Sequence, residues 1–349
     1  MDLIHPASKA DLVEVVGDAN ADRRRLLPVG GRRHLDKGSP AEVDAELWTT
    51  QLDRLVAYEP AEMIAVVEAG MRVGELNRIL SEGDQEWPAD APADATVGGV
   101  VASGASSVRR LKVGALRDTV LEAEVGTGDG RFIRSGARTV KNVTGYDLHK
   151  LVAGSLCTLA VIVQVALKVR PLPRSRRTLR FEGELDVARR VLMAVPAAAG
   201  ALVTAAGVEV RLEGWAGEVE EQSHAATAAA GRALRASDDG PFPSAAPWET
   251  RPVVAEIAVP PSRLDLAIEG DAWGALAGVG LGWVGLGDSD GQLDALRERV
   301  RQAGGIAPVI RGPGGLGDEP VPAPDVHRRL KHAFDPNGVL APGRGWGGL

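Results

Sequence analysis

Apolar side chains in the first half of the chain recur with two different spacings. Apolar residues at 12–16 follow Pro6 and Ser8, which predicts a capped helix shortly after the start. The spacing at 72–83 predicts a second helix, and short apolar runs predict strands at 26–29, 55–58 and 63–70. The first half therefore mixes helices and strands.

Small residues and β-branched residues dominate the next stretch. The segment 91–107 is rich in Ala, Gly and Ser and predicts a loop, while two alternating runs within 120–136 predict a β-hairpin. The Val- and Ile-rich run at 157–171 is too short and too often interrupted to cross a bilayer, so it predicts a buried strand or strand pair. Directly before it, Gly154 and Ser155 leave room for the backbone to approach a bulky group such as a cofactor. Taken alone, the pair is explained more simply by a tight helix-to-strand turn.

Two prolines and four arginines at 170–177 indicate a domain boundary. Beyond it, strands alternate with Ala-rich helices, and a stretch rich in Pro and Gly precedes a final helix at 326–334. No internal repeat is evident. The sequence predicts an α+β fold made of a first domain at 1–173, a smaller α+β second domain at 174–322 and a C-terminal segment at 323–349.

Composition and charge are those of an ordinary globular protein. The 349 residues are 44% hydrophobic and 25% charged, and 40 basic against 47 acidic side chains give a net charge of −7. That balance favours neither nucleic acid nor an anionic membrane as a partner. Neither a signal peptide nor a membrane-spanning run is evident, and the single cysteine, Cys157, has no internal disulfide partner. We expect a cytoplasmic protein without membrane insertion.

Metal and nucleophile motifs are weak. His327 and His332 are five residues apart, which does not match the zinc motif His-Glu-x-x-His, and Gly-x-Ser-x-Gly is absent. We expect no metal site and no hydrolase. The dinucleotide fingerprint Gly-x-Gly-x-x-Gly occurs at 280–285 but does not open a helix, so it predicts a glycine-rich strand. Tyr146 and His149 are candidates for acid–base chemistry, although packing or surface roles suit them equally. No catalytic residue is assigned.

Two glycine-rich loops add to the Gly-Ser pair. The loop at 28–38 follows a strand, and its successive backbone N–H groups together with Arg32 and Arg33 suit a diphosphate. A plain turn with exposed arginines is the alternative. The second loop lies at 95–110. Three sites of close backbone approach within one domain suit an extended ligand.

In this order, the three segments resemble the FAD-binding domain of the vanillyl-alcohol-oxidase and p-cresol-methylhydroxylase (PCMH) family, and most closely its group of glycolate oxidase E subunits. The resemblance covers residues 1–173. Its motifs are LLPVGGRRH, EPAEMIAVVEAGMRVGELNRIL, ATVGGVVASG, GALRDTVLEAEV and VKNVTGYDLHKLVAGSLCTLAVIVQVALKVRP. The final LKHAFDPNGVLAPGR resembles the closing segment, in which the chain returns to the flavin domain. The resemblance implies a PCMH-type FAD domain of two subdomains, followed by a small cap-like substrate domain.

The resemblance also implies the cofactor contacts. The first loop would cradle the FAD diphosphate, the second would line the diphosphate and the flavin edge, and the Gly-x-x-x-Asp and Gly-Ser segments would approach the cofactor. The implied residues are Pro28, Gly30, Gly31, Arg32, Arg33, His34, Thr96, Gly98, Gly99, Ser103, Gly104, Gly114, Asp118, Gly154, Ser155, Val161 and Arg344.

The sequence departs from the family pattern near the expected cofactor path. Arg32 replaces a third glycine, Cys157 and Ala160 replace glycines, and Ala341 replaces an asparagine. Each change adds a side chain or removes a polar one, so the departures imply weaker FAD affinity or its loss. His34 lies near the point where covalent relatives attach the flavin, but GGRRH does not match their Gly-Gly-His pattern. We therefore expect noncovalent FAD.

The resemblance implies an FAD-binding oxidoreductase subunit that takes part in oxidising a small 2-hydroxy acid and passes electrons to a partner. The partners would be a larger flavoprotein subunit and an iron–sulfur subunit, since the chain has no cysteines for a cluster of its own. Two alternatives stay open. One is a noncatalytic scaffold that binds no FAD, and the other is a self-sufficient FAD oxidase of a small alcohol that uses Tyr146, His149 or a second-domain residue as base.

Overall fold

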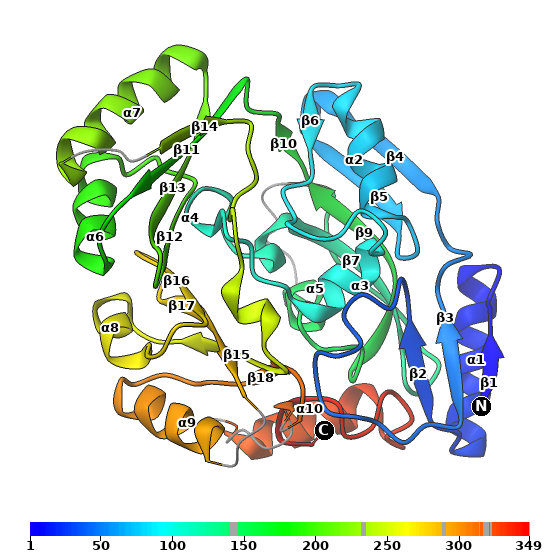
Figure 1. Cartoon of the computed structure of the whole chain (residues 1–349). Helices are drawn as coiled ribbons and strands as arrows, with labels where there is room; N and C mark the ends of the chain where they lie inside the picture. Colours follow the sequence, from blue (N-terminus) through cyan, green and yellow to red (C-terminus); the bar gives the residue numbers. More distant parts are fainter. Residues whose placement is uncertain are drawn as a thin grey trace. The chain divides into compact units, whose positions relative to one another are not determined.

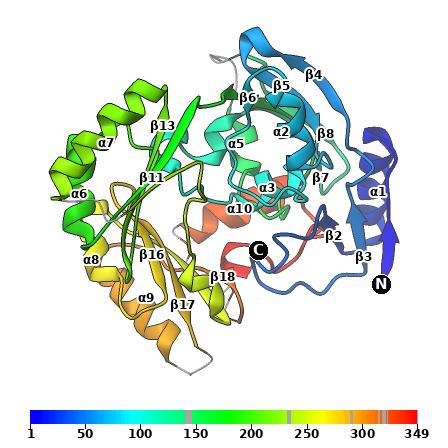
Figure 2. The ribbon, with the colours of Figure 1, turned by 45° about the horizontal axis from the view of Figure 1, so that its top comes forward.

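The computed structural model describes residues 1–139, 146–231, 235–287, 291–313, 315–316, 321 and 323–348. The chain divides into two compact units (Figures 1 and 2). The first comprises Met1–Ser106, Ala115–Leu172 and Gly314–Leu349, and the second comprises Ser107–Gly114 and Pro173–Pro313. We call them unit 1 and unit 2 and describe each by itself.

Unit 1 begins with a small parallel sheet next to a helix. Its three strands run in the order β1-β3-β2, with β1 at Asp2–Ile4, β3 at Ala45–Trp48 and β2 at Leu26–Val29. Helix α1, Lys9–Asp22, begins after Ser8, whose hydroxyl accepts a hydrogen bond from the backbone of Asp11, so the predicted capped helix is confirmed. Leu12 and Val16 of α1 are fully buried against β2 and β3.

The larger sheet of unit 1 is antiparallel and five-stranded, in the order β4-β5-β9-β7-β8. Its strands are β4 (Leu55–Glu59), β5 (Ile64–Glu68), β9 (Ala160–Lys168), β7 (Val120–Thr127) and β8 (Phe132–Gly136). The predicted hairpin is β7–β8, and the predicted buried strand is β9, which lies between β5 and β7. Val161 of β9 packs in the core with α1, whereas Ile162 packs in the core with α2 and α3. Strand β9 therefore joins the two cores of the unit.

Four helices share a core with this sheet within the described residues: α2 (Val73–Ser81), α3 (Val97–Ser103), α5 (Leu148–Val152) and α10 (Pro324–Phe334). A short strand pair, β6 (Gln85–Glu86) and β10 (Arg170–Pro171), completes the region. The predicted helix at 72–83 is confirmed by α2. The predicted loop at 91–107 was wrong in part, because α3 forms there with Thr96 as its N-cap.

The C-terminal segment belongs to unit 1. Helix α10, Pro324–Phe334, precedes a stretch in which Leu340 forms a parallel bridge with Leu26 of β2. Lys331 of α10 is mostly buried, and its ammonium donates to Thr158 O at 2.6 Å, Asp335 Oδ2 at 2.6 Å and Leu340 O at 2.9 Å. One side chain thus ties α10 to the turn before β9 and to the segment beside β2.

Unit 2 is built on an eight-stranded antiparallel sheet with the order β14-β11-β13-β12-β16-β17-β15-β18. In that order, the strands are Arg235–Asp238, Ser175–Phe181, Gly207–Gly214, Gly200–Thr204, Trp273–Leu276, Leu281–Leu286, Val253–Ala258 and Val309–Arg311. The short helix α4, Arg110–Val113, also belongs to this unit. The Gly-x-Gly-x-x-Gly sequence lies largely in β17, so the predicted glycine-rich strand is confirmed.

Four helices contribute to the main core of unit 2: α6 (Leu185–Ala194), α7 (Ala216–Ala230), α8 (Leu264–Ala267) and α9 (Gln292–Gln302). A smaller core contains Trp248 and Trp283, whose rings stack at 5.3 Å. Within the described residues of both units, no helix is long and apolar enough to cross a membrane. The same residues contain no group of three or more His, Cys, Asp or Glu side chains that could hold a metal ion.

Candidate functional site

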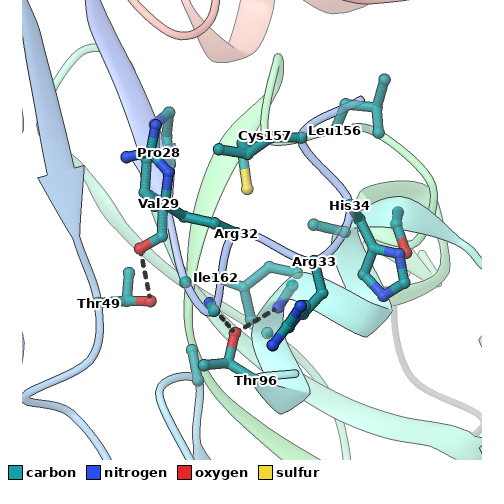
Figure 3. A pocket seen from close by; sticks show the side chains of 18 of the residues that line it. Pro28, Val29, Arg32, Arg33, His34, Thr49, Thr96, Leu156, Cys157 and Ile162 are labelled. Atoms are coloured by element: carbon teal, nitrogen blue, oxygen red, sulfur yellow. Dashed lines mark hydrogen bonds between the residues drawn. The ribbon is translucent and has the colours of Figure 1, made fainter. Parts of the chain in front are cut away.

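A cavity opens in unit 1 between the end of β2, helix α3 and the turn before β9 (Figure 3). Its atom-free space, including the opening to solvent, is about 630 Å³. The residues that line it are Pro28, Val29, Gly30, Gly31, Arg32, Arg33, His34, Leu35, Thr49, Ala69, Ala95, Thr96, Gly98, Gly99, Ala102, Ser103, Leu156, Cys157, Val161, Ile162 and Arg344. The cavity thus gathers most of the residues that the sequence implies for a cofactor, from segments far apart in the chain.

The two glycine loops meet at Thr96. Its hydroxyl accepts hydrogen bonds from the backbone of Gly99 at 3.3 Å and of Gly31 at 3.4 Å (Figure 3). Gly30 and Gly31 must lack a side chain, because a Cβ would lie 2.0 Å from Thr96 Oγ1 at the first position and 2.7 Å from Asp94 O at the second. These glycines therefore allow close packing between the loops.

Gly98 and Gly99, which are adjacent in α3, have different surroundings. A Cβ at Gly98 would lie 2.6 Å from Ala69 Cβ, so this position is closed by protein. At Gly99, which lines the cavity, a Cβ would meet only Thr96 Oγ1, at 3.0 Å. The missing side chain at Gly99 thus leaves cavity space where a ligand can approach the helix backbone.

The two arginines of the first loop are held by carboxylates. Arg32 Nη1 lies 2.7 Å from Oε2 of Glu46, which is 2% exposed, and the guanidinium lies 5.3 Å from the centre of the Trp48 ring. Arg33 forms an ion pair with Asp94 in which both side chains are about half exposed. The predicted contact of both arginines with a diphosphate stays a prediction, and their protein partners are Glu46 and Asp94.

Arg344 fixes the rest of the first loop. Its guanidinium donates to Leu35 O at 3.0 Å, Lys37 O at 2.5 Å and Ser39 O at 3.4 Å, and the residue is 6% exposed. Burial lowers the pKa of the guanidinium, which nevertheless stays charged at neutral pH. The C-terminal segment therefore shapes this wall of the cavity through one buried cation.

His34 stands out in the same loop. Its Nε2 atom is buried, and no group in the described part of the chain forms a hydrogen bond with it. Burial lowers the pKa of the imidazole, and the charge of Lys37 lowers it further, so the ring is neutral at pH 7. In Figure 3 the ring lies across the cavity from Thr49.

Five of the implied residues do not line this cavity: Gly104, Gly114, Asp118, Gly154 and Ser155. A Cβ at Gly104 would lie 2.8 Å from Gly154 Cα, so these two glycines allow backbone packing between α3 and the turn before β9. The Ser155 hydroxyl donates to Val152 O, Asp118 is exposed next to Arg117, and Gly114 belongs to unit 2.

Several lining residues carry no signal in the sequence as cofactor contacts. Thr49 and Ala69 come from other segments and reach the cavity only through the fold. Leu156 and Cys157 directly follow the Gly-Ser pair, and that neighbourhood is the one signal that points to them. Burial raises the pKa of the Cys157 thiol to about 11.

The acid–base candidates lie elsewhere. Tyr146 is 88% exposed, whereas His149 is buried, with Nδ1 3.4 Å from Ser135 Oγ. Neither lines the cavity. Residues 140–145, which belong to the motif around Tyr146, lie outside the described residues.

Three of the four departures from the family pattern have a left-handed backbone. The φ angles are 59° at Arg32, 59° at Cys157 and 41° at Ala341, whereas Ala160 is an ordinary residue of β9. Glycine and asparagine adopt this conformation with least strain, which explains the family pattern at these three positions.

The cavity fits a cofactor such as FAD. Apolar side chains, including Leu156 and Ile162, line the cavity and can contact a planar ring system. Gly99 has no side chain to block access to its backbone, and the buried His34 Nε2 atom has no hydrogen-bond partner among the described residues. A model of the FAD binding domain family matches residues 3–136. The chain is also 30% identical to the glycolate oxidase subunit GlcE of Escherichia coli strain K12 over 354 residues, which span 95% of this chain and 96% of the relative.

The chain belongs to the GlcE family of FAD-binding oxidoreductases. Other relatives match only part of it. A D-lactate dehydrogenase of Archaeoglobus fulgidus is 31% identical over 51% of this chain and 40% of its own length. The glycolate oxidase subunit GlcD of Bacillus subtilis is 27% identical over 51% of this chain and 38% of its own length. The resemblance to FAD-linked oxidoreductases, predicted from the motifs, is confirmed.

Solved structures support the fold. An alkyldihydroxyacetonephosphate synthase aligns with 97% of this chain and 76% of its own at a TM-score of 0.69, with 15% sequence identity. At that identity the match concerns the fold alone. The predicted α+β fold is confirmed, and FAD is the cofactor of the family to which the chain belongs.

Proposed function

We propose that this GlcE-family chain binds FAD noncovalently in the unit 1 cavity and acts as one subunit of a complex that oxidises a small 2-hydroxy acid. The observation that carries the proposal is the cavity itself, where the two glycine loops meet at Thr96 and Gly99 leaves its wall open. When bound, FAD supplies the hydride acceptor for the oxidation.

The chain's own residues would bind and orient the cofactor. The backbone N–H groups of Gly31 and Gly99 lie at the cavity wall, where both donate long hydrogen bonds to the Thr96 hydroxyl that a cofactor oxygen would compete for. Arg33 pairs with Asp94 at a half-exposed position, so exchange of this carboxylate for a cofactor phosphate costs little. Leu156 and Ile162 would exclude water from one side of the ring system. Noncovalent binding is supported by Arg32, which stands directly after Gly30-Gly31 where covalent relatives carry histidine.

The proposed substrate and partners come from the relatives. Their names include glycolate oxidase subunits, D-lactate dehydrogenase and D-2-hydroxyglutarate dehydrogenase, all of which act on 2-hydroxy acids. Two of them are named as subunits, so we propose a larger flavoprotein subunit and an iron–sulfur subunit as partners of this chain. Electrons would leave through these partners. We propose a cytoplasmic location and a substrate-covering role for unit 2.

The first test is the visible spectrum of the purified protein before and after addition of FAD, followed by acid precipitation. Flavin bands that leave with the supernatant support noncovalent FAD. A protein that stays colourless and takes up no FAD contradicts the proposal. Turnover of glycolate and D-lactate with an artificial electron acceptor then separates activity of the isolated chain from activity that needs partner subunits.

Cys157 allows a test of the location. It is the one cysteine of the chain and lines the cavity, so alkylation followed by mass analysis reports on this site alone. The reaction is run at about pH 9, because the raised pKa of the thiol slows it at neutral pH. FAD that occupies the cavity should slow the alkylation, whereas FAD bound elsewhere should leave its rate unchanged.

A second candidate function, an FAD-free scaffold, is favoured by one observation. Both arginines of the first loop already have carboxylate partners, so neither is reserved for a diphosphate. Assembly with partner subunits by a chain that takes up no FAD would support this alternative.

A further inference from the structure

The position of His34 is determined by its loop rather than by contacts of its ring. Arg344 holds the carbonyl groups of Leu35 and Lys37, and the backbone of Lys37 donates to His34 O at 3.2 Å. The loop therefore presents the imidazole to the cavity, although no described protein group pairs with its buried Nε2 atom.

A buried polar atom without a partner is costly. Native proteins pair the large majority of such atoms, because an unpaired one loses its hydration without gaining a hydrogen bond in return. Within the described residues, three other buried side-chain atoms also form no hydrogen bond, and all of them lie in unit 2. In the described part of unit 1, His34 Nε2 is the only such atom, and the His34 side chain lines the cavity. The coincidence points to a ligand group as its partner.

The character of that ligand group follows from the surroundings. Burial keeps the ring neutral, and the nearby Lys37 disfavours its protonation further. A neutral imidazole adds no charge–charge attraction to a diphosphate, and with one N–H donor and one acceptor it pairs well with an amide, carbonyl or hydroxyl group. FAD carries such groups on its ring system and its ribityl chain.

We propose that His34 Nε2 forms a hydrogen bond with an uncharged group of bound FAD and thereby satisfies an atom that is unpaired in the cofactor-free protein. The inference rests on the proposed binding of FAD in this cavity. It assigns His34 as a positioning residue for the cofactor, distinct from a covalent attachment point and from a phosphate ligand.

The test compares His34→Leu with the wild type by two measurements whose expected directions differ. The melting temperature of the cofactor-free variant should be equal or higher, because an unpaired buried group is removed. The Kd for FAD, from flavin fluorescence, should rise roughly tenfold or more, because the cofactor loses its partner. His34→Gln keeps a hydrogen-bonding head and should retain most of the affinity. His332→Leu, at an exposed position of α10, serves as control and should leave the Kd for FAD unchanged.

The outcomes separate the hypotheses. An unchanged Kd in His34→Leu, or a cofactor-free variant that melts lower or fails to fold, overturns the inference, because either result assigns the ring a purely structural role. The ratio of variant to wild-type Kd should be the same at about 0.05 M and about 0.5 M NaCl, and a ratio that shrinks with salt assigns the contact to the diphosphate instead. Absence of FAD binding by the wild type contradicts the proposed function itself.

Discussion

The neighbouring glycines of α3 provide a sharp test of which surfaces the protein uses for packing and which for the cofactor. Gly98 and Gly99 are consecutive in the sequence and share one helix. An added Cβ lies 2.6 Å from Ala69 Cβ and 2.9 Å from Ala69 O at Gly98, but meets only Thr96 Oγ1, at 3.0 Å, at Gly99. The same substitution by alanine therefore probes two different surroundings.

The magnitudes follow from these distances. At Gly98 the methyl group forces α3 away from Ala69, which overpacks the core at a cost of about 1 to 3 kcal/mol. Alanine regains about 0.5 to 1 kcal/mol over glycine in a helix, so Gly98→Ala should lower the free energy of unfolding by up to about 2.5 kcal/mol. Gly99→Ala should leave that free energy unchanged or raise it by up to about 1 kcal/mol. Its methyl group occupies cavity space, so FAD affinity should fall at least about tenfold.

The assay combines urea unfolding of the cofactor-free protein with titration by FAD. The expected pattern is opposite for the two variants: Gly98→Ala loses stability, whereas Gly99→Ala keeps its stability and loses FAD. Equal losses of stability in both variants would refute the assignment of Gly99 to the cavity wall. Wild-type affinity for FAD in Gly99→Ala would show that the cofactor does not approach this helix.

Three further predictions concern the C-terminal segment and the thiol. Lys331→Met should lower the free energy of unfolding by about 3 to 5 kcal/mol, because the buried carboxylate of Asp335 loses its cation; urea unfolding measures this, and recovery in Lys331→Met/Asp335→Asn separates charge from packing. Arg344→Met should weaken FAD binding and open the loop around His34 to limited proteolysis, and unchanged cleavage would exclude this role. Because the folded pKa of Cys157, about 11, exceeds its ordinary value of 9.0, its contribution to stability is complete below pH 9 and lost as pH rises through about 11. Urea unfolding across that pH range should show a loss of up to about 2 kcal/mol that Cys157→Ala lacks.

The strands of the larger sheet of unit 1 were predictable because each carries its own local signal, whereas β1 and β3 of the small sheet were not predicted. β5 and β9 are β-branched runs, and the β7–β8 hairpin brackets its glycines. Helix α3 was not predictable, because its two glycines lower its helix propensity and contacts with another segment stabilise it instead. Val97 N donates to Met71 O and Gly98 N to Ala69 O, both at 2.8 Å, and these acceptors lie in another segment.

The sequence located the site through its glycines, which mark places where the backbone approaches another group closely. It did not distinguish glycines that approach a cofactor from glycines that approach another part of the protein. Gly104 and Gly154 pack against each other, although the same small residues in sequence suit a cofactor equally well. The neighbouring Cys157 lines the cavity instead. Thr49 lines the cavity only because the fold brings distant segments together, and no local sequence pattern predicts that. A glycine in a sequence indicates that some group lies close to the backbone at that position, and only the fold shows which group it is.

Arg32 shows how a departure from the family pattern is stabilised. Its φ of 59° costs a residue with a side chain about 1 to 2 kcal/mol relative to glycine. The side chain offsets that cost through Glu46, whose carboxylate is 2% exposed and otherwise accepts from Trp48 Nε1 at 2.9 Å. Restoring the family glycine with Arg32→Gly should therefore lower the free energy of unfolding by about 1 to 3 kcal/mol, because the buried carboxylate of Glu46 loses its half-exposed cation and this loss outweighs the relief of strain.

The double variant Arg32→Gly/Glu46→Gln decides whether this reasoning holds. The neutral amide keeps the acceptor for Trp48 and removes the uncompensated charge, so urea unfolding should show recovery of most of the stability, while the relaxed backbone persists. The single and double variants together measure the coupling between the two positions. If Arg32→Gly alone stabilises the protein, the strain at position 32 is larger than the ion pair, and Arg32 must be retained for another reason, with cofactor binding as the first to examine by FAD titration.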